Sequence, residues 1–401
     1  MSDHAVTPFR VDVAQDVLDT IRAKVRAYDW HEMPEIAPGE DRWAYGTDMR
    51  YLRALCDHWL EAYDWRDAEA ALNRHPQFTA TIDGQMIHFL HIRGSGSGDD
   101  ALLLTHGWPG SVYEFHDVID RLAHPQRHGG TAAAGIDLVI PSLPGFGFSG
   151  KPPRPVGPRR IAELWGRLMR ETLGYRRYVA QGGDWGAFIS GMLGLDHTHA
   201  HGGGCEAVHL NMFGLRPAGP FAAEEDRAWA EAVARFRTRE SAYSQLQATK
   251  PQTLSYGMMD SPVGVAAWIV EKFNTWADTR GPDGRRDIEH VFTKDQLLTN
   301  VMIYLVTRSF NTATWIYRGR ADEGGAVMPA GRRVEVPTAI ANFPCEIIPF
   351  PARRLVETGY NVVRWTDFER GGHFAAMETG PVFADDVAAF VAQVRAMRAG
   401  G

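Results

Sequence analysis

The sequence predicts an α/β protein in which a mostly parallel sheet, flanked by helices, is interrupted by a helical insertion and preceded by a helical segment. Three observations lead to this fold class. Short apolar runs alternate with helical or loop segments from residue 86 to about residue 211, strand signals then stop until about residue 325, and they resume afterwards. Alternation of strands and helices is typical of a parallel sheet. The insertion is therefore expected to form a lid over a core whose sheet continues after it.

The N-terminal part is expected to be helical. Val17, Ile21 and Val25 recur at four-residue spacing behind Asp16, which would cap the helix. A second amphipathic stretch, "DMRYLRALCDHWLEAYDW", follows. Four segments result: 1–85, a helical segment packing on the core; 86–215, the first part of the core; 216–325, the helical lid; and 326–401, the second part of the core.

The strands of the core are expected at seven apolar runs, each bounded by turn residues or by a helical segment. These runs are "MIHFLHIR" (86–93), "ALLLT" (101–105), "IDLVIP" (136–141), "YVAQ" (178–181), "AVHLN" (207–211), "PTAIANF" (337–343) and "NVVRW" (361–365). In the lid, Trp229, Val233 and Phe236 share one helical face. The run "VFADDVAAFVAQVRAM" is expected to be the last helix.

Composition narrows the class of protein. The 401 residues include 42 Lys and Arg against 49 Asp and Glu, a formal charge of −7, with 44% hydrophobic and 23% charged residues. This balance is that of an ordinary soluble globular protein, and the absence of a basic patch argues against nucleic acid as a partner. Cys56, Cys205 and Cys345 are widely spaced and odd in number, which favours a reducing compartment over a disulfide framework. No apolar run approaches the roughly 20 residues of a membrane helix, and the N-terminus lacks a signal peptide's apolar core. We expect a cytoplasmic protein without a membrane anchor.

The stretch "QGGDWGAFIS" (181–190) places Asp184 between Gly182 and Gly186, directly after a predicted strand. A nucleophile on a sharp strand-to-helix turn needs such small neighbours, because the following helix passes close to the strained backbone. The alternative is that Asp184 merely caps the next helix.

The stretch "LTHGWPGS" (104–111) follows an earlier strand, where an oxyanion site can be built from backbone N–H groups. The amide of Trp108, together with that of Trp185 just after the candidate nucleophile, would form such a site. The alternative is an ordinary turn at the end of a strand. His106 itself is expected to be a structural hydrogen bonder.

The stretch "ERGGHFAAME" (369–378) places His373 on a glycine loop between the last strand and the last helix. Its position late in the chain fits the order nucleophile, acid, histidine. Glu346, in "NFPCEIIP", and Asp367 could each orient this histidine. We favour Glu346 because it closely follows a strand, and strand ends carry the functional groups in open α/β sheets.

These stretches together resemble epoxide hydrolases of the α/β-hydrolase superfamily, specifically the branch with the microsomal and juvenile-hormone enzymes. The resemblance spans nearly the whole chain, including the N-terminal helical segment. It is carried by "HGWPGS", "GGDWG", "ESAYSQLQATKPQTL" (240–254), "DSPVGVAAWIVEKFNTW" (260–276), "FPCEI" and "ERGGHFAAME". It implies the α/β-hydrolase fold with a lid.

The resemblance also implies a reaction. Asp184 would attack the carbon of a small apolar epoxide and form an alkyl ester, which suits a carboxylate because it is already ionised at neutral pH. Two lid tyrosines would donate hydrogen bonds to the epoxide oxygen. Tyr243 matches the first position, and Tyr317 in "TATWIYRG" matches the second, with Tyr304 as a fallback.

In the second half of the implied reaction, His373, held by Glu346, would activate water to hydrolyse the ester on Asp184. The amides of Trp108 and Trp185 would stabilise the oxyanion. A vicinal diol leaves, and neither a metal nor an organic cofactor is needed. The sequence is compatible with a homodimer, and with a detoxifying as well as a biosynthetic role.

Two other functions remain open. A haloalkane dehalogenase shares the fold and the nucleophile; Trp185 would suit halide binding, whereas Tyr243 and Tyr317 argue against it. A non-catalytic ligand receptor on the same scaffold would not need a complete set of nucleophile, acid and base. The histidine-rich stretch "DHTHAHGGGC" (196–205) lacks the spacing of a recognised zinc site, so no metal is expected.

Overall fold

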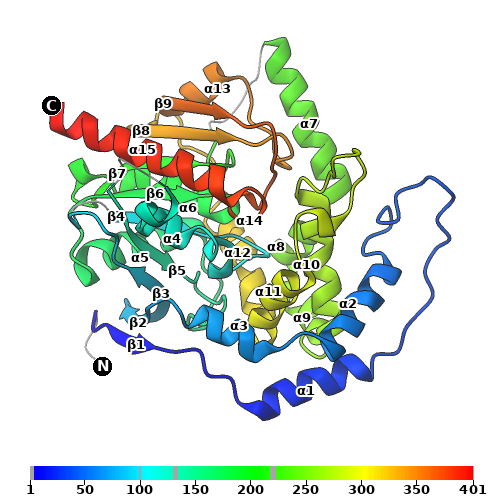
Figure 1. Ribbon diagram of the computed structural model, residues 1–401. Helices are drawn as coiled ribbons and strands as arrows, with labels where there is room; N and C mark the ends of the chain where they lie inside the picture. The colour runs from blue at the N-terminus through cyan, green and yellow to red at the C-terminus, as the bar shows by residue number, and fades with distance from the viewer. Residues whose placement is uncertain (1–3, 99–100, 130–133, 217–222, 401) are drawn as a thin grey trace.

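The structure is a computed structural model that describes residues 4–98, 101–129, 134–216 and 223–400 (Figure 1). These residues form one sheet of nine strands in the order β1-β2-β3-β5-β4-β6-β7-β8-β9. Neighbours from β1 to β5 in this order pair antiparallel, and those from β5 to β9 pair parallel. The predicted mostly parallel sheet is confirmed. The strands are β1 (Thr7–Phe9), β2 (Gln77–Ile82), β3 (Gln85–Ile92), β4 (Ala101–Thr105), β5 (Asp137–Pro141), β6 (Tyr178–Gly182), β7 (Cys205–Leu210), β8 (Val334–Asn342) and β9 (Tyr360–Asp367).

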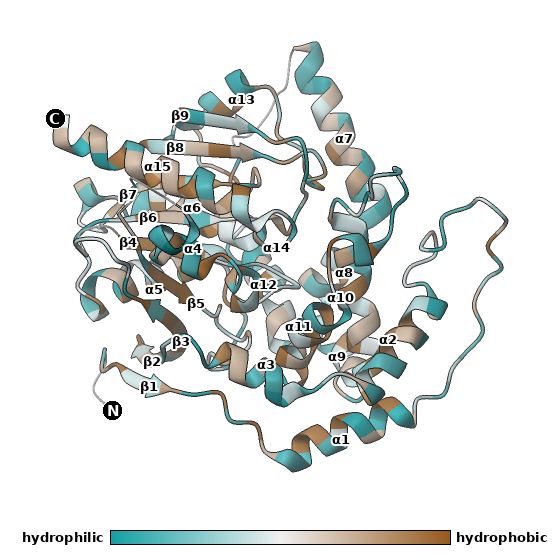
Figure 2. Cartoon of the chain, in the orientation of Figure 1, coloured by the Kyte–Doolittle hydropathy of each residue, from teal (hydrophilic) through white to brown (hydrophobic). Residues whose placement is uncertain are grey.

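Helices cover both faces of this sheet. Leu103 of β4 faces the side packed by α5 and α6, whereas Leu102 and Leu104 face the side packed by α4 and α15. This alternation follows from the two-residue period of a strand, and it explains why the central strands are apolar throughout (Figure 2). The core helices are α4 (Ile119–Ala123), α5 (Pro158–Arg167), α6 (Asp184–Asp196), α13 (Arg353–Glu357), α14 (Ala375–Glu378) and α15 (Gly380–Gly400).

The lid lies between β7 and β8 in the chain. Figure 1 shows the arrowheads of β8 and β9 pointing toward the lid, so the lid faces the carboxyl ends of the strands. This is the edge where open α/β sheets bind their ligands. The lid helices are α7 (Glu224–Glu240), α8 (Ala242–Thr249), α9 (Pro251–Met258), α10 (Pro262–Trp276), α11 (Lys294–Val306) and α12 (Phe310–Asp322).

The N-terminal segment differs from the expectation of helices alone over residues 1–85. Its helices α1 (Gln15–Arg26), α2 (Met49–Glu61) and α3 (Trp65–Leu72) pack against lid helices α10 or α11. However, β1 and β2 also lie in this range and extend the sheet beyond β3. Strand β2 forms a hairpin with β3 around Asp83 and Gly84, both at positive φ, and Asp-Gly is a preferred pair for such a turn.

The first helix does not begin where the sequence predicts. Helix α1 begins after Ala14, so Asp16 is not the N-cap; it lies in the first turn, where its carboxylate accepts a hydrogen bond from the amide of Val17.

No helix in the described part of the chain is long and apolar enough to cross a membrane. Residues 1–3, 99–100, 130–133, 217–222 and 401, which the predicted segments include, lie outside the described residues.

Candidate active site

Asp184 lies on the sharp turn that joins β6 to α6. Its φ of 44° is in the left-handed region, which non-glycine residues seldom adopt and which often marks a functional position. The two flanking glycines are sterically required: a Cβ on Gly182 would lie 2.2 Å from the carbonyl carbon of Gly186, and a Cβ on Gly186 would lie 1.9 Å from the carbonyl oxygen of Thr105. The turn thus holds the carboxylate of Asp184 at the carboxyl end of the sheet.

The loop after β4 binds one oxygen of this carboxylate. The amide of Trp108 donates a hydrogen bond to Asp184 Oδ1 over 2.7 Å. The amide of Trp185 belongs to the first turn of α6, where N–H groups have no acceptor within the helix. His106 holds the loop, because its Nδ1 hydrogen-bonds the carbonyl of Gly107 and its Nε2 accepts from the amide of Leu143. Burial lowers the pKa of His106 to about 4, in keeping with a neutral structural residue.

His373 lies between Glu346 and Asp184. Its Nδ1 is 3.0 and 3.1 Å from the two oxygens of Glu346, and its Nε2 is 3.4 Å from Asp184 Oδ2. Both His373 and Glu346 are buried, at 5% exposure each. Asp367 points elsewhere, since its carboxylate accepts hydrogen bonds from Asn342 and Trp365.

The charge state of His373 follows from these neighbours. Burial lowers its pKa, but the charges of Glu346 and Asp184 and their hydrogen bonds outweigh burial and hold the pKa well above its ordinary value. The histidine of the resting site is therefore an imidazolium.

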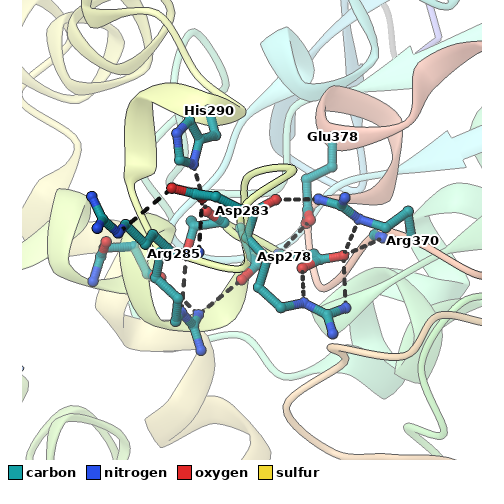
Figure 3. Close-up of polar contacts among 12 residues, drawn as sticks. Asp278, Asp283, Arg285, His290, Arg370 and Glu378 are labelled. Atoms are coloured by element: carbon teal, nitrogen blue, oxygen red, sulfur yellow. Dashed lines mark hydrogen bonds and ion pairs between the residues drawn. The ribbon is translucent and has the colours of Figure 1, made fainter.

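The lid anchors the loop that carries His373, as Figure 3 shows for several of the contacts. Asp278, just after α10, binds the side chain of Arg370 and the amide of Gly371. The carboxylate of Glu378 accepts from the amides of Asp278 and Phe374, and the amide of His373 donates to the carbonyl of Trp276. Sequence reasoning missed this anchor, because its members are about 100 residues apart in the chain.

Two lid tyrosines lie over the nucleophile. Tyr243 of α8 stacks on the indole of Trp108, with ring centroids 5.0 Å apart, and Tyr317 of α12 meets the ring of Trp185 edge-on at 4.7 Å. The two phenol rings are 5.8 Å apart. Burial raises the pKa of both hydroxyls, so both are protonated and able to donate. Such hydroxyls suit the stabilisation of a developing alkoxide.

The contacts favour Tyr317 over Tyr304 as the second tyrosine. The hydroxyl of Tyr317 is buried and has no hydrogen-bond partner among the described residues. In contrast, the hydroxyl of Tyr304 donates to the carbonyl of Gly110 over 2.7 Å. A buried hydroxyl without a partner costs stability, which is expected where a ligand supplies the missing partner.

A further acidic residue, Glu114, was not expected in the site. It lies in the short helix η1 (Val112–Phe115) and lines a small cavity with Asp184 and His373. The signal in the sequence is weak. It consists of one acidic residue in "GSVYEF", at the end of the loop after β4 that carries Trp108, which we call the oxyanion loop.

The histidine-rich stretch does not gather into a metal site. His199 and His201 hydrogen-bond the carbonyl of Arg176 and the hydroxyl of Thr198, respectively. Across the described ranges, no group of three or more His, Cys, Asp or Glu side chains is placed to hold a metal ion.

Comparisons with known proteins agree with this geometry. The family described as epoxide hydrolase N terminus matches residues 6–115, and the family described as alpha/beta hydrolase fold matches residues 100–208. Epoxide hydrolase 1 of Oryctolagus cuniculus is 32% identical over 98% of this chain and 90% of its own length. Juvenile hormone epoxide hydrolase 2 of Ctenocephalides felis is 34% identical over 96% of this chain and 85% of its own length. The solved structure of Aspergillus niger epoxide hydrolase superposes with a TM-score of 0.83 at 31% identity and covers 97% of both chains.

Proposed function

This chain belongs to the epoxide hydrolase family, and we propose that it opens epoxides to vicinal diols by way of an ester on Asp184. One observation carries the proposal. The carboxylate of Asp184 receives the Trp108 amide on Oδ1 and lies 3.4 Å from His373 through Oδ2, and Glu346 holds the other side of that histidine.

Ring opening uses the second oxygen of the nucleophile, Oδ2. Because Oδ1 is bound by the Trp108 amide, Oδ2 attacks the epoxide carbon, and the carbon–oxygen bond of the ring breaks. The electrons of that bond go to the epoxide oxygen. The hydroxyls of Tyr243 and Tyr317 donate to this oxygen as its charge develops.

Ester formation changes the histidine from an acid to a base. The charge of Asp184 helps to keep the pKa of His373 high, and this charge disappears when the ester forms. The imidazolium then releases its proton, which neutralises the alkoxide through the tyrosine hydroxyls. The neutral His373 that remains is able to accept a proton from water.

Hydrolysis completes the cycle. His373 takes a proton from water, and the hydroxide attacks the ester carbon of Asp184. The resulting oxyanion forms on Oδ1, where the Trp108 and Trp185 amides bind it. The intermediate collapses to an acid, whose proton passes to the departing alkoxide, and the diol leaves with one oxygen from Asp184. The carboxylate and the imidazolium are both restored.

The walls of the site favour an apolar epoxide. Trp108, Trp185 and Trp276 are each at most 3% exposed and surround the nucleophile and the tyrosines. Their rings belong to the hydrophobic core, which gives the site apolar walls with a few polar groups that orient the substrate. We also propose a cytoplasmic location, since the cysteines Cys56, Cys205 and Cys345 are free thiols.

The test is the intact mass of a His373→Gln variant after incubation with a panel of epoxides. Without its base, the variant should form the ester and stall, so that a peptide containing Asp184 gains the mass of one whole epoxide. Asp367→Asn, which removes the acid that the sequence offered as an alternative partner of His373, is the matched control and should turn over normally.

A second readout follows the oxygen. In a single turnover of the wild type in ¹⁸O-labelled water, the label should enter Asp184 and not the diol. Label in the diol would contradict the ester mechanism. Release of halide from haloalkanes, without diol formation from any epoxide, would instead favour a dehalogenase.

A further inference from the structure

The cavity beside Asp184 has a second carboxyl group that the mechanism above does not use. Its lining includes Gly107, Trp108, Asp184 and His373, together with Glu114. The backbone makes room for this carboxyl group: a Cβ on Gly110 would lie 1.4 Å from Glu114 Oε1. Glu114 thus lies in the wall of the catalytic site, where burial of a carboxyl group costs free energy unless the group has polar partners.

The neighbours of Glu114 control its charge. Burial raises its pKa to about 8; the charge of His373 and a hydrogen bond with the backbone of Gly107 lower the pKa, and the charge of Asp184 raises it. The hydroxyl of Tyr304 is a further titratable group close to it. Near neutral pH the carboxyl group of Glu114 in the resting site is therefore neutral.

The cavity has the size of a water site. The space open to the centre of a water molecule is about 20 Å³, and roughly 10–15 Å³ is enough for one water that finds two to four polar partners. In the resting site His373 Nε2 is buried and lies 3.4 Å from Asp184 Oδ2, and this ion pair is lost when Oδ2 becomes the oxygen of the ester. A water in this cavity would meet Nε2 on one side and the carboxyl group of Glu114 on another.

We infer that Glu114 and His373 together hold the water that hydrolyses the ester on Asp184. The water donates one hydrogen to His373 Nε2 and the other to an oxygen of Glu114, so that a lone pair of its oxygen faces the ester carbon. As the bond from this oxygen to Asp184 forms, the first hydrogen passes as a proton to His373, and the second stays on the new carboxyl group until the alkoxide takes it. The inference rests on the proposed ester mechanism.

Glu114 acts as a neutral carboxyl group in the second half-reaction. Ester formation removes the negative charge of Asp184, which raises the pKa of Glu114, and the release of the proton from His373 removes a positive charge, which lowers that pKa. The charge of His373 is the larger of these two influences, so their joint loss keeps Glu114 neutral. When the water must be oriented, the carbonyl oxygen of this neutral carboxyl group accepts its hydrogen.

The experiment separates the two half-reactions in Glu114→Leu, which keeps most of the bulk of the side chain but has no oxygen to accept a hydrogen from the water. Ester formation is followed by tryptophan fluorescence, since Trp108 and Trp185 line the site, and ester decay is followed by rapid quench and intact mass. We expect ester formation to stay within about threefold of wild type, and hydrolysis to fall by about 10- to 100-fold, the scale of a misplaced reactant. The ester should then accumulate in the steady state.

The ratio of the two rate constants decides the outcome. A purely structural role in holding Gly107 would lower both rates in parallel, or neither, and either result would overturn the inference. Glu69→Leu is the control: Glu69 is a partly buried glutamate of α3, in the N-terminal segment, and does not line the cavity. It should leave the ratio unchanged even if it lowers the stability of the fold.

The pH profile of hydrolysis gives an independent readout. Wild type should show a limb from Glu114 in addition to that of His373, and Glu114→Leu should lack it. Failure of the ester mechanism itself looks different, because the wild type and His373→Gln would then form no ester at all.

Discussion

Gly107→Ala should disable the nucleophile by direct contact. A Cβ at this position would lie 2.2 Å from Asp184 Oδ1 and 2.6 Å from its Cγ, whereas ordinary contacts begin near 3.4 Å. Relief of the clash requires a relative movement of about 1 Å between the oxyanion loop and the carboxylate, and a misplacement of this size can lower a rate by about 100-fold. We expect ester formation to slow by that factor, with a loss of stability of about 1–3 kcal/mol from overpacking.

The assay is single-turnover ester formation by rapid quench, combined with thermal unfolding. Gly257→Ala in α9 is the control, because a Cβ there meets nothing within 4 Å; alanine should stabilise that helix by up to about 1 kcal/mol and leave the rate unchanged. If Gly107→Ala formed ester within about threefold of the wild-type rate, the close approach of Gly107 to the carboxylate of Asp184 would not position the nucleophile, and the reasoning would be refuted.

Three further predictions follow from the same contacts. Tyr243→Phe and Tyr317→Phe should each slow ester formation by about 10- to 100-fold in single-turnover assays, because each removes a donor to the developing alkoxide; an unchanged rate in both would reassign the acid. Glu346→Gln should lower the pKa of His373 and slow hydrolysis by about 10²- to 10⁴-fold, seen as ester accumulation and as a shift of the pH–rate limb to lower pH. Burial raises the pKa of Asp386, but hydrogen bonds from His209 and other partners outweigh it and lower the pKa to about 2. A carboxyl group whose pKa is lowered by folding stabilises the fold at pH values above its pKa in the unfolded chain, and this stabilisation is lost as the pH falls through about 2. Asp386→Asn should therefore lower the free energy of unfolding by about 2 kcal/mol at pH 7, as measured by denaturant unfolding. The difference in free energy between the variant and the wild type should vanish near pH 2.

Much of the core could be predicted from the sequence because its signals are local. The run "ALLLT" is β4, Ala101–Thr105, since four consecutive apolar residues fit a strand that is buried on both faces. The glycines around Asp184 are equally local, because the sharp turn excludes larger side chains at those positions. The epoxide hydrolase family was also readable, because its motifs lie in short continuous stretches.

The tertiary structure decided the features that depend on residues far apart in the chain. Tyr304 and Tyr317 differ only in what their hydroxyls meet, and the partner of Tyr304 is the backbone of Gly110, nearly 200 residues away. Strand β1 belongs to the sheet because its backbone pairs with the edge strand β2, about 70 residues further along the chain.

Glu114 is the clearest case. The sequence by itself determined that an acid follows the oxyanion loop, but burial and the nearby charges of Asp184 and His373 determine its pKa. A pKa is a property of surroundings in three dimensions, and these surroundings are assembled from η1, α6 and the loop after β9.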